Sequence, residues 1–326
     1  MTNKKNVIIF AEQQHDKIQS ISYELLSKGK EIAEKTGAEL FAVLLGEQMD
    51  EEAKELIYYG ADKVFLYQHS SLKDFNPLNY KVNIVNLVQE QKPALLLLGA
   101  SHLGRSLAPR LAVALKTGLS ADCIGLEVDD AGNIIQIRPA FSGSILAYIK
   151  NKKEPVIATL RYKSSQSRER DSSRKGEIIS REAEISPPLL TILRKEKSGE
   201  INLTEADIII TGGRGLKKVD DLSILSGLAE ICGGVIGVSR PLVDDGWIGK
   251  EHQVGFSGNT VKPKVYIACG VSGSSQHLAG MRGSDIIIAI NTDPSAPIFK
   301  VADYGIVGDL YEIVPKLISE IKGRTS

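Results

Sequence analysis

Long apolar runs, clustered cysteines and an excess of one charge are all missing from this 326-residue sequence. Lys plus Arg and Asp plus Glu number 40 each, so the formal net charge is zero. A nucleic-acid-binding protein needs a basic surface to displace counterions from phosphates, and the charge balance argues against that class. The longest apolar runs, such as residues 94–98, are far too short to span a bilayer, and the N-terminus lacks the apolar stretch of a secretory signal. We expect no membrane insertion and a cytoplasmic location.

The three cysteines, Cys123, Cys232 and Cys269, are too few and too scattered for a disulfide framework. None lies at metal-ligand spacing from another, and no two histidines do, so we expect free thiols and no metal site. The sequence also contains no P-loop and no readable Ser/His/Asp arrangement. Neither half begins with a GxGxxG turn followed by a ribose-binding acid, which disfavours a standard NAD dehydrogenase. We therefore predict no catalytic residues in the hydrolytic sense.

The sequence does have a regular alternation of short apolar runs and amphipathic stretches. In the first half, apolar runs such as Leu40–Leu45 alternate with helical patterns such as Ile21–Lys35, which indicates parallel βαβ units. The same rhythm restarts after about residue 200, and the chain is long enough for two domains. We predict an α/β fold with an N-terminal parallel-sheet domain, residues 1–198, and a C-terminal doubly wound, Rossmann-like domain, residues 199–326.

The segment between these two rhythms has a different character. Ile145–Ile149 and Val156–Leu160 are two β-rich runs on either side of a turn-like stretch, residues 151–155, which predicts a β-hairpin. The Ser-rich, charged stretch that begins at Arg161 predicts a solvated connection, because acids interrupt its bases and no aromatic ladder follows Tyr162. Two prolines and the charged run at 194–200 place the domain boundary near residue 198.

Unusual residues follow four predicted strands of the second half. They are Gly212–Gly215, Ser239 with Arg240, Gly270–Ser275 and Asn291. Ligands of an open parallel sheet bind beyond the carboxyl ends of its strands, where glycines let the backbone approach and a following helix offers free N–H groups. One glycine alone would indicate only a tight turn. Four such ends together predict a phosphate or nucleotide site, with Arg214 and Arg240 as counter-charges.

His277 stands beside this glycine-rich segment, at the start of the predicted helix. A lone histidine is more often a surface or capping residue than a functional one. At this position, however, a cationic imidazole would hold an anionic ligand, so we include His277 among the candidate site residues.

The segments that follow these strands resemble the sequence signature of a known protein family. Residues 265–291, VYIACGVSGSSQHLAGMRGSDIIIAIN, closely resemble the signature of the electron-transfer flavoprotein alpha subunit. So do VSRPLVDDGW and HQVGFSG within residues 237–258, and APIFKVADYGIVGDL at 296–310. The first half matches more loosely, most clearly in LGRSLAPRLAVALKTGLSADC and RPAFSG. The resemblance covers essentially the whole chain.

This resemblance implies a heterodimer with a beta subunit and an FAD held mainly by the C-terminal domain. The FAD-binding residues that it implies are Arg214, Ser239, Arg240, Val254, Gly255, Phe256, Ser257, Ser272, Gly273, Ser274, Ser275, Gln276, His277, Asn291, Asp309 and Leu310. In the family, the arginine matching Arg240 lies against the flavin ring, and the histidine matching His277 faces the C2 carbonyl. The hydroxyl matching Ser257 approaches N5. We expect Arg240 and His277 to stabilise negative charge on reduced FAD.

Some positions depart from the commoner pattern of the family. Phe256 stands where a Gln is usual, Asn259 where a Lys is usual, and Ser275 where an aliphatic residue is usual. Ser257 replaces the Thr of some members and keeps the hydroxyl. Phe256 removes a polar contact near the flavin, which puts redox tuning by that contact in doubt.

The resemblance also implies an acyl-CoA or related flavin dehydrogenase as the electron-transfer partner. The TGLSADC and RPAFSG segments look more like members from anaerobes, some of which bifurcate electrons from NADH to ferredoxin through sites on the beta subunit. We expect no cysteine-rich, ferredoxin-like N-terminal extension, and the residues do not decide between a bifurcating and a non-bifurcating protein. The alternative is a non-redox adenine-nucleotide-binding regulatory module, although the first βα turn, Ala11–His15, has no glycine cradle.

Overall fold

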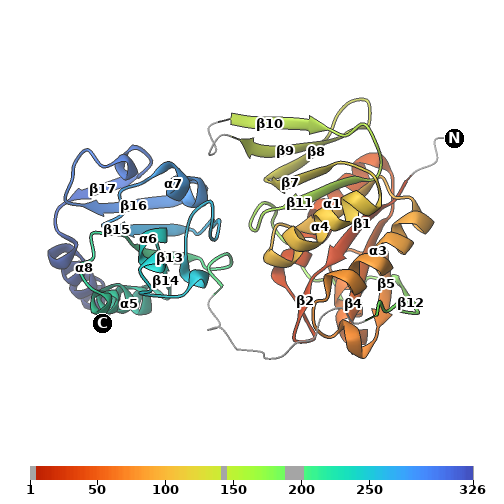
Figure 1. The fold of residues 1–326 in the computed structure, drawn as a ribbon, viewed down its shortest axis with the longest axis horizontal. Coiled ribbons are helices and arrows are strands. Elements are labelled where there is room, and N and C mark those ends of the chain that lie inside the picture. The colour runs from red at the N-terminus through yellow and green to blue at the C-terminus, as the bar shows by residue number, and fades with distance from the viewer. Residues whose placement is uncertain (1–4, 141–144, 188–201, 326) are drawn as a thin grey trace. The chain divides into compact units, whose positions relative to one another are not determined.

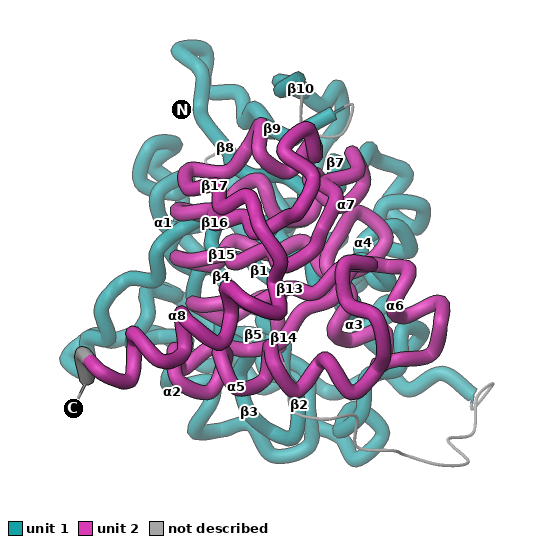
Figure 2. Tube along the Cα trace, turned by 90° about the vertical axis from the view of Figure 1, so that its left-hand side faces the viewer, with its two compact units in different colours: residues 1–191 teal, residues 192–326 magenta. Residues whose placement is uncertain are grey.

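The computed structural model describes residues 5–140, 145–187 and 202–325. The chain divides into two compact units, residues 1–191 and 192–326, which Figure 2 distinguishes by colour. The boundary predicted near residue 198 lies outside the described residues. Each unit contains a parallel sheet, which confirms the α/β class (Figure 1). No helix in the described part of the chain has the length and apolar character needed to cross a bilayer.

Unit 1 is built on a seven-stranded sheet in the order β12-β5-β4-β1-β6-β11-β7, and every pairing in it is parallel. The strands are β1 (Val7–Ala11), β4 (Leu40–Gly46), β5 (Lys63–Gln68), β6 (Leu95–Gly99), β7 (Leu119–Cys123), β11 (Val156–Leu160) and β12 (Glu177–Arg181). The central strands are buried on both faces, which is why their sequences are continuous apolar runs rather than alternating ones.

Helices cover both faces of this sheet. Helices α1 (Ser20–Thr36) and α2 (Asp50–Tyr58) pack into one core, and α3 (Pro77–Gln91) and α4 (His102–Ala114) pack into the core on the opposite face. The remaining short elements are β2 (Gln13–Gln14), β3 (Lys17–Ile18) and η1 (Ser70–Leu72). A three-stranded antiparallel sheet is formed by β8 (Gly125–Val128), β9 (Ile134–Ala140) and β10 (Ile145–Lys150).

The predicted β-hairpin is wrong. Strand β10 pairs antiparallel with β9, whereas β11 pairs in parallel with β6 and β7 inside the seven-stranded sheet. All five residues of β11 are buried, which suits a central parallel strand, whereas Ile145 and Tyr148 of β10 are exposed. The residues between the two runs favour a turn, but this preference is local. The pairing of β11 is decided instead by the burial of both of its faces.

The stretch predicted as a solvated connection is exposed but held along unit 1. Arg170 makes two hydrogen bonds to the Glu55 carboxylate of α2, both at 2.7 Å, and Arg168 contacts Glu34 of α1. The chain then forms β12, which pairs with β5 along its whole length. The sequence did not predict this strand, because β12 lies in a charged segment and only two of its own five side chains are apolar.

Unit 2 is built on a five-stranded parallel sheet in the order β14-β13-β15-β16-β17. Its strands are β13 (Ile208–Gly212), β14 (Val235–Val238), β15 (Val265–Cys269), β16 (Ile286–Asn291) and β17 (Tyr304–Val307). Its helices are α5 (Leu222–Cys232), α6 (Arg240–Asp244), α7 (Ser275–Met281) and α8 (Leu310–Thr325), with short helices η3 (Val219–Asp221), η4 (Lys250–His252) and η5 (Pro297–Lys300). Helices α5, α6 and α8 pack on one face and α7 on the other, which confirms the doubly wound arrangement.

The two sheets differ where their strand order reverses. In unit 1 this point lies between β1 and β6, and it is filled by Glu12, whose Oε2 accepts a 2.6 Å hydrogen bond from the Ser101 hydroxyl. A Cβ on Gly99 would lie 2.6 Å from Glu12 Oε1 and 2.8 Å from Ile21, so the space is packed. A buried carboxyl at this point disfavours a nucleotide phosphate in unit 1.

Burial makes Glu12 the source of a pH-dependent stability. The side chain is 2% exposed, and desolvation raises the pKa of its carboxyl to about 7, although the Ser101 hydroxyl acts in the opposite direction. The folded chain therefore holds a proton that the unfolded chain releases at about its ordinary pKa of 4.5. Stability is fully present below that value and is lost as the pH rises toward 7.

Between pH 4.5 and pH 8, we expect the titration of Glu12 to lower the free energy of unfolding of the wild-type chain by about 3 kcal/mol. Each unit of difference between the folded and unfolded pKa contributes about 1.36 kcal/mol. Glu12→Gln should remove this component, because the amide carries no titrating proton. Urea unfolding followed by circular dichroism at several pH values measures it, with Glu169→Gln, an exposed position, as the control. An unchanged pH dependence in the Glu12 variant would contradict the assignment.

Candidate functional site

A pocket of about 590 Å³ lies at the carboxyl edge of the unit 2 sheet. Segments that follow all five strands line it: Arg214 and Gly215 after β13, Ser239 and Arg240 after β14, the Gly270–Ser274 stretch after β15, Asn291 and Thr292 at the end of β16, and Gly308–Leu310 after β17. A loop at residues 253–257 forms a further wall. The strand-end pattern in the sequence predicted four of these five strand ends, and the family resemblance supplied Asp309 and Leu310 after β17.

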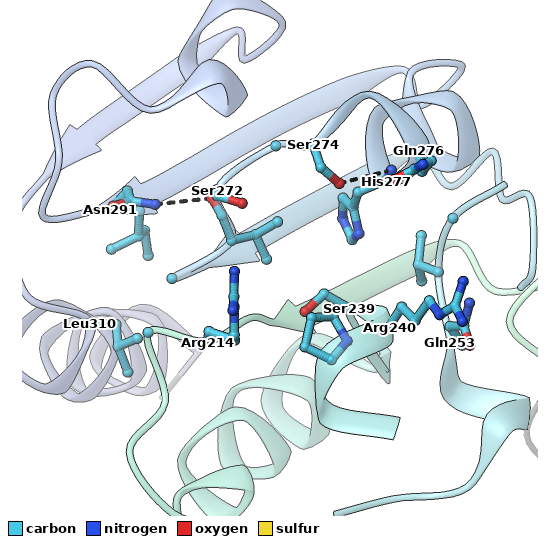
Figure 3. A pocket seen from close by; sticks show the side chains of 18 of the residues that line it. Arg214, Ser239, Arg240, Gln253, Ser272, Ser274, Gln276, His277, Asn291 and Leu310 are labelled. Carbon is cyan, nitrogen blue, oxygen red and sulfur yellow. Dashed lines mark hydrogen bonds between the residues drawn. The ribbon is translucent and has the colours of Figure 1, made fainter. Parts of the chain in front are cut away.

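The pocket brings together all of the predicted site residues except Ser275. Those that line it are Arg214, Ser239, Arg240, Val254, Gly255, Phe256, Ser257, Ser272, Gly273, Ser274, Gln276, His277, Asn291, Asp309 and Leu310. Ser275 is the first residue of α7 and is exposed outside the pocket lining. In Figure 3, Arg214 and His277 point from opposite sides toward the same interior.

The floor of the pocket is a contact between two backbones. The amide of Gly213 donates to the carbonyl of Cys269, and the amide of Gly215 donates to the carbonyl of Gly270, both at 3.0 Å. A Cβ on Gly215 would lie 2.6 Å from Gly270 Cα, and a Cβ on Gly270 would lie 2.7 Å from Gly215 Cα. Neither position admits a side chain, so the loops after β13 and β15 close on each other by their main chains.

The turn into α7 has a similar constraint at Gly273. Its φ of +83° is in the left-handed region, and a Cβ there would lie 2.4 Å from the backbone nitrogen of Ile298. The Ser274 side chain then caps α7 by accepting a hydrogen bond from the His277 amide at 3.4 Å. Gly273 therefore fixes the path of the chain along the pocket wall.

Polar side chains around the pocket are held by hydrogen bonds. Asn291 Nδ2 donates to the Val271 carbonyl at 3.0 Å, which joins the ends of β15 and β16, and Gln253 Nε2 donates to the Ser257 hydroxyl at 2.9 Å. Gln253, Asp244, Thr292 and Gly308 also line the pocket, and the sequence analysis missed them as site residues. Thr292 and Gly308 directly follow strands, so a search of every strand end for polar and glycine residues would have found them.

Two arginines provide positive charge at the pocket. Arg240 begins α6, and its Nε donates to Asp244 Oδ2 at 3.1 Å, one helical turn later. Both side chains of this pair are more than half exposed, so the attraction between them is weak and leaves Arg240 able to reorient. Arg214 follows β13 and is also exposed. The pocket therefore presents cations from two of its walls.

The cationic state expected for His277 is not what its surroundings favour. The side chain is 5% exposed, and desolvation lowers the pKa of its imidazole to about 4, with the backbone of Val254 acting in the opposite direction. The imidazole is therefore neutral at pH 7. Its Nε2 lies 2.9 Å from the Tyr266 hydroxyl, and its Nδ1 is buried without a hydrogen-bond partner among the described residues.

Two residues that depart from the expected family pattern occupy the loop over the pocket. Phe256 is 67% exposed and lines the pocket, and its amide donates to the Gln276 carbonyl at 2.8 Å, which ties the loop to α7. Asn259 does not line the pocket. Its Nδ2 donates to the carbonyls of Glu251 and Gln253 at 2.7 and 3.2 Å, so it closes the loop on itself.

The three cysteines are free thiols, as expected. Cys269 ends β15 directly below the pocket floor and is fully buried, and burial raises the pKa of its thiol to about 12. Burial also raises the pKa of Cys123 to about 12. These thiols stay protonated at pH 7, so neither is a nucleophile under ordinary conditions.

The pocket fits an anionic cofactor. Its volume lies within the range of small-molecule and cofactor sites. The glycine segments after β13 and β15 allow close backbone approach, and arginines from two walls offer counter-charge to phosphates. A buried ring nitrogen that still needs a partner, His277 Nδ1, provides a polar contact for a heterocycle. These features are those of a dinucleotide site.

Comparison with known proteins agrees with this geometry. A family model described as the electron transfer flavoprotein domain matches residues 7–186, and one described as the electron transfer flavoprotein FAD-binding domain matches residues 202–282. The chain is 46% identical to the electron transfer flavoprotein subunit alpha of Thermoanaerobacterium thermosaccharolyticum over 99% of both chains. It is 40% identical to the lactate dehydrogenase (NAD(+),ferredoxin) subunit LctC of Acetobacterium woodii, over 98% of this chain and 77% of that one. It is 37% identical to the acryloyl-CoA reductase electron transfer subunit beta of Anaerotignum propionicum, over 98% and 96%.

The Gly273 turn leads to a prediction for cofactor retention. Gly273→Ala should weaken FAD binding roughly tenfold to a hundredfold, because strain of about 1–3 kcal/mol displaces the chain from Ile298. Gly233→Ala is the matched control, since Gly233 has a φ of +64° with open space around its Cβ position. The ratio of flavin to protein absorbance after gel filtration measures the loss. Full flavin content in the Gly273 variant would show that this turn does not shape the cofactor site.

Proposed function

Since the chain belongs to the electron transfer flavoprotein alpha-subunit family, we propose that the pocket of unit 2 holds its FAD and that the chain carries electrons on it between redox partners. The observation that supports this placement is the meeting of nearly all the family's FAD-binding positions in one pocket, at the ends of five strands. The protein works as one subunit of a heterodimer with a beta subunit, and the complex exchanges electrons with a flavin dehydrogenase.

The residues of the pocket divide into those that bind and those that tune. The loops after β13 and β15, closed by Gly215 and Gly270, receive the phosphates, with Arg214 as a counter-charge. Arg240 and His277 also line the pocket and would contact the flavin ring. Bound FAD supplies the redox chemistry, because it accepts two electrons and releases them singly. Arg240 supplies positive charge to the ring, and the neutral His277 supplies a hydrogen bond.

The same proposal includes electron bifurcation from NADH to ferredoxin, with both of those partners bound through the beta subunit. Two observations support it. The first half of the chain carries TGLSADC and RPAFSG segments of the type found in anaerobes, and the last three residues of RPAFSG, 141–143, lie outside the described residues. The chain is also 40% identical to a subunit of a lactate dehydrogenase whose name includes NAD(+) and ferredoxin.

The function is tested with the chain co-expressed with its beta subunit. We expect a yellow 1:1 complex that contains FAD and that passes electrons to a flavin dehydrogenase, whereas the chain alone should be unstable or inactive. In the presence of ferredoxin, a bifurcating complex should oxidise two NADH for every two ferredoxins and one dehydrogenase substrate reduced. A colourless complex would contradict FAD binding. NADH oxidation without ferredoxin reduction would contradict bifurcation but leave the proposed FAD binding and electron transfer intact.

The exposed guanidinium of Arg240 leads to a separate prediction. Arg240→Ala should lower the one-electron reduction potential of the bound FAD by at least about 59 mV, which is a tenfold change in the equilibrium, because negative charge on the ring loses a cation of the pocket. His277→Ala should have a smaller effect. Stepwise reduction followed by absorbance against redox dyes measures the potentials.

Arg240→Lys is the control for charge, since lysine keeps the positive charge but loses the planar fork. Its potential should stay closer to wild type than that of the alanine variant. If both variants bind FAD more weakly but titrate at the wild-type potential, Arg240 holds the cofactor and does not tune it.

A further inference from the structure

Tyr266 is a buried tyrosine at the second position of β15, and its hydroxyl reaches His277, a histidine that lines the pocket. It is 0% exposed, and its Oη lies 2.9 Å from His277 Nε2. Tyr266 itself does not line the pocket, so it contacts the site only through the histidine. Neither the sequence analysis nor the matched family positions assign it a role at the site.

The direction of this hydrogen bond and the tautomer of His277 depend on each other. Burial raises the pKa of the Tyr266 phenol, with the Thr211 side chain acting in the opposite direction, so the phenol keeps its proton at pH 7. The imidazole of His277 is neutral, and a neutral imidazole has one nitrogen that donates and one that accepts. The phenol can donate to Nε2 or accept from it, and the Thr211 side chain also lies at the phenol. Where the phenol donates to Nε2, that nitrogen is the acceptor and the ring proton lies on Nδ1.

The second ring nitrogen is then the one that can meet a ligand, with the Val254 backbone also favouring a proton on the ring. Nδ1 is buried and has no hydrogen-bond partner among the described residues, although the ring lines the pocket (Figure 3). A buried N–H without a partner costs about 1–3 kcal/mol, so an acceptor that enters the pocket gains by meeting it. Tyr266 holds the ring at Nε2, and the Ser274 side chain accepts a hydrogen bond from the main-chain amide of His277.

We propose that Tyr266 is a positioning residue that fixes the tautomer of His277, so that Nδ1 carries the proton and serves as the hydrogen-bond donor to an acceptor atom of FAD. This inference rests on the proposed placement of FAD in the unit 2 pocket. Without the phenol, the ring is free to place its proton on either nitrogen and to rotate. The imidazole then presents an N–H to the cofactor in only part of the molecules, and the reduced flavin ring loses part of its stabilisation.

The test uses the FAD-loaded heterodimer with Tyr266→Phe, which removes one hydroxyl and keeps the ring in the core. The ¹⁵N signals of His277 in histidine-labelled protein report which nitrogen carries the proton. We expect the wild-type complex to show the Nδ1-protonated tautomer and the variant to show a mixture or the opposite tautomer. The same variant should shift the one-electron potential of FAD toward that of His277→Ala.

A double-mutant cycle separates a role through the histidine from general damage to the fold. In the His277→Ala background, Tyr266→Phe should cause no further shift of the potential. Tyr80→Phe, which removes another buried phenol hydroxyl from the core of unit 1, is the matched control and should leave the potential unchanged. Unchanged ¹⁵N signals in Tyr266→Phe, or an equal potential shift with and without His277, would overturn the inference. A wild-type complex that lacks FAD would instead overturn the proposed function.

Discussion

The pocket of unit 2 depends on one constraint, which is that five parallel strands end at the same edge of a sheet. The chain must turn after each of them, and the turns after β13 and β15 pack so closely that only backbone fits between Gly215 and Gly270. Their amides and carbonyls pair with each other, so the floor is rigid before any side chain is considered. The side chains that give the site its charge and polarity are then placed around this floor by neighbouring turns.

The sequence predicted most of this site because the relevant signals are local. A strand is recognisable from a short apolar run, and the residue after it needs no knowledge of the rest of the fold, so Arg214, Ser239 and Gly273 could be identified without a structure. The pairing of β11 could not, because the choice between a hairpin and a central strand depends on burial by distant helices. The neutral state of His277 could not be predicted either, because it results from burial by residues that are distant in the sequence.

The two units have a similar architecture but differ in whether it leaves room for a ligand. Both sheets reverse their strand order next to the first strand of the unit, yet one such point is open and lined by glycine, and the other is filled by Glu12. A single buried acid, bound to Ser101 and packed against Gly99, converts a potential ligand site into a junction of strands and helices. A similar strand order therefore gives no guide to which unit carries the cofactor. The residues at the reversal decide it.

Strand β12 has a consequence for how the N-terminal half behaves during synthesis. It pairs with every residue of β5 except the last, and Arg181 at its end bonds to Glu90 at 2.6 Å and lies over the Phe65 ring. Before residues 177–181 leave the ribosome, β5 is an open edge with the apolar sequence Val-Phe-Leu-Tyr, and such an edge can recruit strands of other chains. The exposed, charged segment before β12 therefore connects the sheet to the strand that covers its open edge and protects it from aggregation. A fragment that ends within this segment would leave the apolar edge of β5 exposed.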